Sequence, residues 1–335
     1  MQSRRANPVR FALFVWLILF TLAVAATAGV RMRFAPKFVP GEVLRYRIES
    51  RTTTTGTTTT PIVNPEGGSK SVQTIHMVVR LETRGVSTDS KVRFHATYEK
   101  SSAESETDAL DLAASSFADQ YNRLEGRSVE FTLQPYGQIT DFQDVSAAPS
   151  IQSTAGQRNA DQSAAESALA LLQGLSPGSA FPQKGVTIGQ KWTNELPIAG
   201  ALLSGLMRRS DSSYLRDETC SSSAASQASG SPVSAGPDQC AVILTRFVIV
   251  RRGSTDADAT PDDYRRNGLR TSGTWTGSGE SLDSISLATG LLVNSTQTST
   301  QEMDYKIISA TSGSSIHRVG KVQSQSEITL IPDHP

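Results

Sequence analysis

The two cysteines are the residues of this 335-residue chain whose type and spacing best define a chemistry. Cys220 and Cys240 enclose a segment of about twenty residues that is rich in Ser, Ala and Gly. A redox pair needs C-x-x-C spacing, and a zinc site needs two more ligands nearby. In an oxidising compartment an isolated pair forms a disulfide, and closing a loop of this length stabilises by about 3 kcal/mol. We therefore predict a structural disulfide between Cys220 and Cys240.

Histidines and aspartates offer two weaker candidates for a metal site. His76 and His95 fall on the polar sides of neighbouring predicted strands, but the turn near Ser87 does not place them opposite each other. We therefore interpret both as solvated residues. The acidic run over 256–263 fails as a calcium loop, because Pro261 replaces the required glycine and no glutamate follows at the right place. The sequence predicts no metal site.

Sequence motifs for catalysis are missing. The chain has no G-x-S-x-G elbow, no G-x-x-x-x-G-K-[ST], no H-E-x-x-H and no G-x-G-x-x-G after a strand. Gly273, Gly277 and Gly279 surround Trp275 in a strand-like run, where glycine marks a bend or a close backbone approach. We predict a non-catalytic protein without a cofactor.

Charge and composition exclude one further class of protein. Lys and Arg number 32, as do Asp and Glu, so the formal net charge is zero. A general nucleic-acid binder needs a basic excess to displace counterions. Aromatic residues make up only 6 % of the chain, whereas Ser and Thr are abundant, which indicates a β protein with a solvated face.

The first 28 residues have the three parts of an export signal. Basic residues precede an uncharged apolar run over 11–28, which ends in a small-x-small sequence, Ala-Thr-Ala. This pattern favours cleavage. The run also approaches the length of about 20 residues that a transmembrane helix needs, and Arg31 and Arg33 follow it, so an uncleaved inner-membrane anchor is the alternative.

Period-two alternation predicts strands along most of the remaining chain. Runs of this kind, or of β-type residues, lie at 44–48, 75–81, 92–98, 129–133, 139–142, 206–216, 271–286, 291–300, 303–308 and 316–331. The run over 241–250 is apolar on both faces and indicates a central strand. Thr289-Gly290 is typical of a hairpin turn.

Helical spacing appears in two segments. Apolar residues recur every three or four positions at Leu110, Ala114, Phe117, Tyr121 and Leu124. Thr107 and Asp108 are candidate caps for this helix, and Gly126 can end it. A second helix is predicted over 163–175, because Ser163 and Glu166 have capping-box spacing.

These elements predict an α+β protein that is mostly β. The expected architecture is a large curved antiparallel sheet, half-barrel-like, with two or more helices packed on its apolar face. We expect residues 29–335 to form a single domain, with a disordered loop over 220–240 that the disulfide closes.

Two short motifs resemble those of an uncharacterised class of exported bacterial proteins. The first is Pro-Gly-Glu-Val-Leu-Arg-Tyr over 40–46, and the second includes Phe181-Pro182 and Val-Thr-Ile-Gly-Gln-Lys-Trp over 186–192. The class is associated with curved sheets similar to the half-barrels of periplasmic lipoprotein carriers. The resemblance implies a protein of the bacterial periplasm or cell envelope, and it implies no activity because neither motif carries chemistry.

The predicted function is binding without catalysis, with a lipid or another apolar small molecule on the inner face of the curved sheet. The residues expected to line that face are Leu44, Tyr46, Phe94, Tyr98, Phe117 and Trp192. Charges would lie on the opposite side of the same strands, at Arg45, Arg47, Arg80 and Arg93. The alternative is a structural protein whose core is filled and which contacts another envelope protein. The volume of any cavity in the curve distinguishes the two hypotheses.

Overall fold

A single antiparallel sheet organises the chain. The computed structural model describes residues 31–34, 37–59, 68–108, 118–134, 139–145, 181–182, 184–198, 201–220, 238–252 and 259–332. Within these ranges the strands of the sheet follow the order β5-β4-β3-β2-β1-β11-β10-β9-β8-β7-β6. Their bounds are β1 Val43–Thr59, β2 Ser69–Val86, β3 Val92–Thr107, β4 Ser128–Leu133, β5 Ile139–Asp144, β6 Lys191–Pro197, β7 Leu206–Thr219, β8 Gln239–Arg251, β9 Leu269–Ser286, β10 Leu292–Ser309 and β11 Ser315–Ile331.

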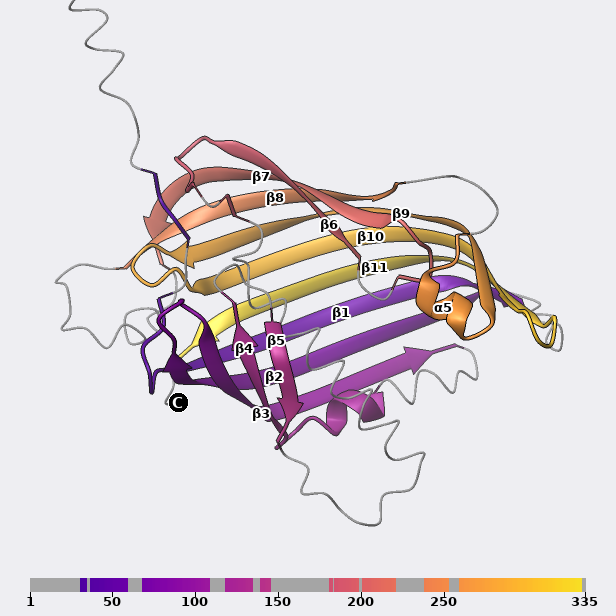
Figure 1. Cartoon of the computed structure of the whole chain (residues 1–335), viewed down its shortest axis with the longest axis horizontal. Coiled ribbons are helices and arrows are strands. Elements are labelled where there is room, and N and C mark those ends of the chain that lie inside the picture. The colour runs from indigo at the N-terminus through magenta and orange to yellow at the C-terminus, as the bar shows by residue number, and fades with distance from the viewer. Residues whose placement is uncertain are drawn as a thin grey trace, which may run out of the picture.

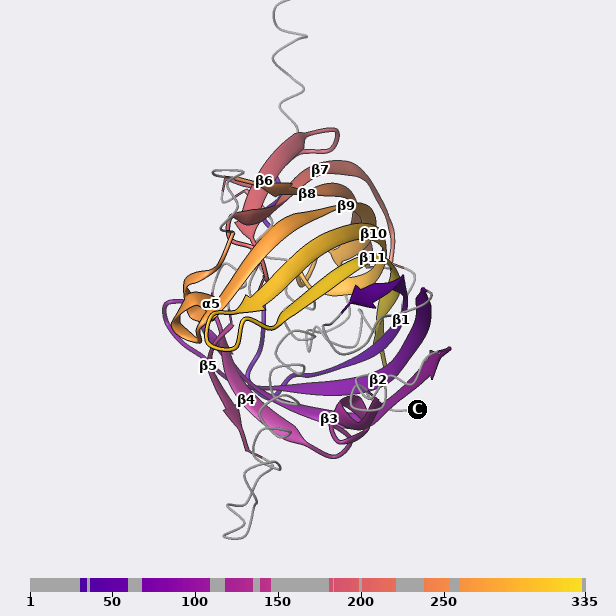
Figure 2. The same ribbon diagram turned by 90° about the vertical axis from the view of Figure 1, so that its right-hand side faces the viewer.

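The long strands run side by side and the sheet is strongly curved (Figure 1, Figure 2). β1 pairs with β11, with Tyr46 opposite Leu330, so strands from the two ends of the sequence meet in the middle of the sheet. β5 and β6 are its two edges and do not pair with each other, so the sheet stays open. Both edges are short, and β6 ends at Pro197, which has no N–H to offer another strand.

Alternation assigns each strand an inner and an outer face. On β1, Leu44, Tyr46 and Ile48 are buried, whereas Arg47 and Glu49 are exposed on the other side. We call the face that carries the buried Tyr46 the inner face. The sheet as a whole is strongly curled (Figure 2). The predicted strands and the predicted position of the arginines on the opposite face are confirmed, because period two fixes both within one strand.

Three apolar clusters occupy the inner face. The β1–β4 core includes Leu44, Tyr46, Met77, Val79, Phe94, Tyr98 and Phe131. The Tyr214 cluster includes Phe34, Val186, Tyr214, Ile243, Ile285 and Leu292. The Tyr305 cluster includes Leu203, Leu206, Ile249, Ala259, Met303 and Tyr305. Loop residues that precede β1 or β6 thus complete the packing where the sheet curves.

The predicted α+β class is wrong, because the described residues are almost all strand. Helix is confined there to residues 118–122 and to α5, Asp262–Arg266, which are too short to cover the sheet. β3 continues through Thr107, and Asp108 accepts a hydrogen bond from the Lys70 backbone N–H at 2.7 Å. Residues 109–117 of the first predicted helix lie outside the described residues. The predicted helix over 163–175 lies outside the described residues.

The short helix at 118–122 satisfies polar groups of β3. The Ser101 hydroxyl donates to the Tyr121 carbonyl at 2.6 Å, and the Ala103 N–H donates to the Asn122 side-chain oxygen at 2.8 Å. Leu124 is buried in the β1–β4 core, and Gly126 follows with a positive φ of 76°. This turn therefore closes β3 rather than forming a lid over the sheet.

Two strands differ from their predicted limits. Trp192 lies in β6, which is absent from the strands predicted from the sequence; Lys191–Pro197 forms a strand because it pairs with β7. β10 is one strand where two were predicted, since no turn residue interrupts it near Gln301.

The predicted disulfide is confirmed. Cys220 and Cys240 are bonded, with their Cα atoms 5.0 Å apart, where β7 and β8 end their pairing. Cys240 is fully buried beside Val293, and the Cys220 N–H donates to the Asp238 carbonyl at 2.9 Å. The predicted disordered loop, over 221–237, lies outside the described residues.

The predicted N-terminal signal or anchor, residues 1–28, also lies outside the described residues. In the part of the chain that the structure describes, neither helix has the length and hydrophobicity that crossing a membrane requires.

Candidate functional site

The residues predicted to line a ligand site separate into three groups. Leu44, Tyr46, Phe94 and Tyr98 lie together in the β1–β4 core and are between 0 and 2 % exposed. Trp192 packs instead against the Tyr214 cluster, with its ring 5.7 Å from that of Phe181. Phe117 lies outside the described residues.

The four buried residues act as packing groups in this structure. Phe94 contacts Phe38 edge-on at 4.8 Å and Phe131 at 5.4 Å between ring centroids. The Tyr46 hydroxyl donates to the Leu292 carbonyl at 3.0 Å, which ties β1 to β10 across β11. Burial raises the pKa of Tyr46 and of Tyr98. These side chains therefore stabilise the curve of the sheet.

A polar belt crosses the inner face beside these clusters. Its first row crosses the neighbouring strands β1, β11, β10, β9, β8 and β7. In that order it consists of Ser50, Ser326, Gln297, Ser281, Thr245 and Ser212. Its second row, two residues further along each strand, contains Gln73, Thr52, Ser324, Ser299 and Ser210. We define these two rows as the polar belt. Most of its members are half-buried, which is intermediate between a dry core and an open surface.

Hydroxyl groups of the belt partly satisfy one another. Thr52 and Ser324 are 3.1 Å apart, and Ser212 and Thr245 are 2.9 Å apart, so each pair shares a hydrogen bond across two strands. Cross-strand hydroxyl pairs of this kind stabilise by about 0.2–1 kcal/mol each. The inner face was predicted to have apolar walls throughout, and that prediction is wrong for this stretch.

Asp283 borders the belt on one side. Its carboxylate accepts hydrogen bonds from Ser295 at 2.6 Å and from Ser281 at 3.1 Å. Burial raises the pKa of Asp283, while the two hydroxyl groups and the charge of Arg208 act in the opposite direction. The backbone places Asp283 on the inner face, because it pairs with the buried Ile243 of β8.

Arg208 borders the belt on its other side. Its guanidinium carbon lies 4.0 Å from the centroid of the Phe247 ring, in cation–π contact. The ring has room because Gly279 faces it: a Cβ on Gly279 would lie only 2.6 Å from a ring carbon of Phe247. The close approach predicted for the glycines around Trp275 is thereby confirmed at Gly279.

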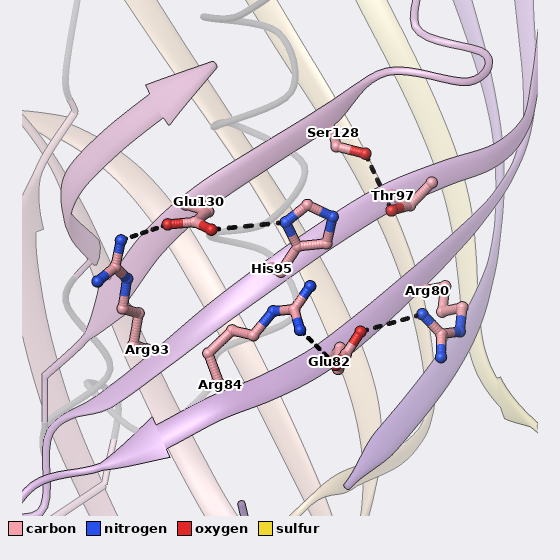
Figure 3. A network of polar contacts seen from close by, with 8 residues as sticks. All are labelled: Arg80, Glu82, Arg84, Arg93, His95, Thr97, Ser128 and Glu130. Atoms are coloured by element: carbon pink, nitrogen blue, oxygen red, sulfur yellow. Dashed lines mark hydrogen bonds and ion pairs between the residues drawn. The ribbon is translucent and has the colours of Figure 1, made fainter. Parts of the chain in front are cut away.

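The outer face of β2–β4 carries a network of ion pairs (Figure 3). Glu82 pairs with Arg80 at 3.4 Å and with Arg84 at 2.8 Å. Glu130 pairs with Arg93 and lies 3.7 Å from the Nδ1 atom of His95. The hydrogen bond from Arg93 lowers the pKa of Glu130, although burial opposes this shift. Such exposed pairs stabilise weakly, and the network has the features of a solvated sheet surface.

The histidines are placed as predicted relative to each other. His76 lies opposite Ser102, whereas His95 lies opposite Glu82, so the two rings are several residues apart along the strands. Across the described ranges, no three His, Cys, Asp or Glu side chains are grouped closely enough to hold a metal ion.

Two shallow hollows open on the outer face, with volumes of about 490 and 460 Å³. Thr55, Thr276, Glu302 and Lys321 are among the residues that line the first. Arg246, Ser278 and Thr298 line the second, over the back of the polar belt. None of the residues predicted for a ligand site lines either hollow.

Sequence reasoning did not single out Arg208, Phe247 or Asp283. The period-two alternation of β7 could have placed Arg208 on the inner face. Arg208 lies two residues after Leu206 and six before Tyr214, and both of these are buried on that face. No comparable signal identified Gly279 as the residue beneath Phe247, because that contact depends on the register of two strands.

Comparisons with known proteins give no family. No family model and no curated protein matches this sequence. A solved structure concerned with lipid–protein interactions in lipovitellin is 13 % identical, with a TM-score of 0.40, over 88 % of this chain and 25 % of that one. The chain thus spans about a quarter of the lipovitellin chain. The outer membrane protein OprG from Pseudomonas aeruginosa is 7 % identical, with a TM-score of 0.18, over 88 % of this chain and 98 % of its own.

Proposed function

We propose that this protein is a non-catalytic binding protein that holds a lipid-like amphiphile against the inner face of its curved sheet. The observation that carries the proposal is the polar belt between apolar clusters. Ser, Thr and Gln side chains that are half-buried are costly in a dry core but suit the polar part of a ligand. The Tyr214 and Tyr305 clusters lie along the same strands and suit its apolar part.

The proposal moves the binding region away from the residues that the sequence first indicated. Leu44, Tyr46, Phe94 and Tyr98 are packed, so a ligand that displaced them would lose core contacts. Trp192 remains a candidate binding residue, because it lies opposite Ser212 at the β6 end of the belt. Trp275, which packs against the Tyr305 cluster, lies near the other side of the belt.

Trp192 and Trp275 provide a direct test. Dibromostearate quenches indole fluorescence only at short range, so added dibromostearate should quench Trp192 and Trp275 in the purified exported protein. Trp192→Phe and Trp275→Phe variants assign the signal, and stearate without bromine is the control. Organic extraction of the freshly purified protein should also release lipid. The proposal is wrong if the protein carries no lipid and dibromostearate does not quench either tryptophan.

A structural role is the second candidate, and the closed β1–β4 core favours it. A protein of this kind would contact another envelope protein through its surface and would carry no ligand. Failure of both lipid tests would favour this candidate.

Export to the bacterial periplasm or cell envelope is part of the proposal. It is supported by the signal-like N-terminal sequence and by the Cys220–Cys240 disulfide, since disulfides persist in oxidising compartments. The intact mass of the purified protein will distinguish cleavage after Ala28 from an uncleaved anchor over 11–28. Recovery of the protein in the cytosolic fraction would contradict export.

A further inference from the structure

Arg208 occupies a boundary between polar and apolar surface. It pairs with Ile249 of β8, a member of the Tyr305 cluster, and it follows Leu206 of the same cluster by two residues. On its other side lies the second row of the polar belt, where Ser210 follows on β7. A cation at this position faces both surfaces that an amphiphile needs.

Arg208 has no carboxylate within ion-pair distance in the described chain, although the charge of Asp283 acts on it from further away. No carboxylate of the described residues forms an ion pair with it, and its Nε atom is buried without a hydrogen-bond partner. Burial lowers the pKa of the group, although guanidinium stays protonated at any physiological pH. By contrast, the similarly half-buried Arg45 pairs with Glu99 at 2.7 Å. A half-buried cation without an ion-pair partner is costly, and such a group fits a ligand that supplies the anion.

Asp283 does not form an ion pair with Arg208. Its carboxylate is held by Ser281 and Ser295, and it lies opposite Ile243, three inner-face positions along β8 from Ile249. The guanidinium carbon lies 4.0 Å from the centroid of the Phe247 ring, and this cation–π contact positions the group beside the belt. A preorganised guanidinium binds carboxylate or phosphate oxygens in a bidentate manner.

We propose that Arg208 binds the anionic headgroup, carboxylate or phosphate, of the amphiphile on the inner face, with the apolar chain on the Tyr305 cluster. This inference rests on the proposed function and further specifies that the ligand is anionic. A charge-assisted hydrogen bond changes affinity by about tenfold or more, so the headgroup sets a clear preference.

The test compares three alkyl-chain probes that differ in the headgroup, together with inorganic phosphate, which has no chain. Dodecanoate, dodecyl phosphate, dodecanol and inorganic phosphate are titrated below micelle formation into the full exported chain, by calorimetry. Wild-type protein should bind the two anionic amphiphiles about tenfold more tightly than dodecanol. Arg208→Gln should abolish this preference and leave dodecanol binding unchanged, while Arg208→Lys should restore part of it. Arg209→Gln is the matched control, because Arg209 is exposed on the opposite face.

The outcomes separate this inference from the proposed function. Equal affinity of wild-type protein for dodecanoate and dodecanol, or an unchanged preference in Arg208→Gln, overturns the headgroup site but leaves amphiphile binding intact. Binding of inorganic phosphate that depends on Arg208, without binding of either anionic amphiphile, also overturns it, since the site then takes a free anion. If no amphiphile binds, the proposed function fails and this inference fails with it.

Discussion

The inner face is built in two contrasting ways. Over β1–β4 it is a dry core, in which Phe94, Tyr98 and Val79 are at most 2 % exposed. Over β7–β11 the same face carries most of the polar belt, which also reaches β1 and β2, between two smaller apolar clusters. Both regions belong to one continuous sheet, so the contrast arises from the inward-facing side chains and not from a change of architecture.

The contrast teaches how a curved sheet divides stability and function. In the β1–β4 core, buried aliphatic and aromatic side chains pack together, and the Phe94–Phe131 pair adds to the stabilisation from burial alone. In the polar belt, hydroxyl pairs such as Ser212–Thr245 contribute little each, and the buried Nε atom of Arg208 beside it has no hydrogen-bond partner among the described residues. Groups that stabilise weakly in the folded state are candidates for binding.

The largest expected effect lies in the β1–β4 core. Phe94→Ala should lower the free energy of unfolding by about 3–5 kcal/mol, because it removes contacts to Phe38 and Phe131 and leaves a cavity. Gln297→Ala, in the polar belt, should change it by less than about 0.5 kcal/mol. Urea unfolding followed by circular dichroism measures both. Equal losses in the two variants would remove the contrast between the regions.

The next effect concerns the disulfide, which joins the ends of β7 and β8 in the half of the sheet that carries most of the polar belt. Replacing Cys220 and Cys240 together by alanine should lower the free energy of unfolding by about 3 kcal/mol, since the unfolded chain regains the freedom of the closed loop. Reducing the wild-type protein should have a similar effect and serves as the control. An unchanged denaturation midpoint would show that β7–β8 pairing holds the region without the covalent bond.

The smallest effect concerns Asp283 and depends on pH. Burial raises its pKa above the unfolded value of about 3.9, so the folded state binds the proton more tightly. The contribution of this carboxyl to stability is therefore present below the unfolded pKa and is lost as pH rises through the folded pKa. Asp283→Asn should gain stability relative to wild type as pH rises from about 4 to 7. Urea midpoints across this range measure the difference, and a relative gain by wild type would contradict the assignment.

Much of the fold was predictable from local pattern, and the failures are informative. Alternation over 44–48 and 92–98 correctly predicted strands and their buried sides. The first predicted helix is described only in part, as helix over 118–122, and its candidate cap Thr107 belongs to β3 because it pairs with Ser71 of β2. Propensity and capping signals are weak priors that such tertiary pairing overrides.

The candidate site was less predictable than the fold. Aromatic residues drew attention because they suit an apolar ligand, yet Phe94 and Tyr98 serve the core. Arg208 appeared ordinary beside Arg209, since two adjacent arginines on a strand point to opposite faces and only one becomes buried.

The sequence by itself determined which side chains share a face of each strand, the pairing of its two cysteines and the absence of a recognisable catalytic motif. These properties are local, because a period of two fixes facing within a strand. Only the tertiary structure decided that β1 pairs with β11, that hydroxyl groups of neighbouring strands form one belt, and that Gly279 makes room for Phe247 and Arg208. Those features depend on the register between strands distant in sequence, which no single strand's pattern specifies.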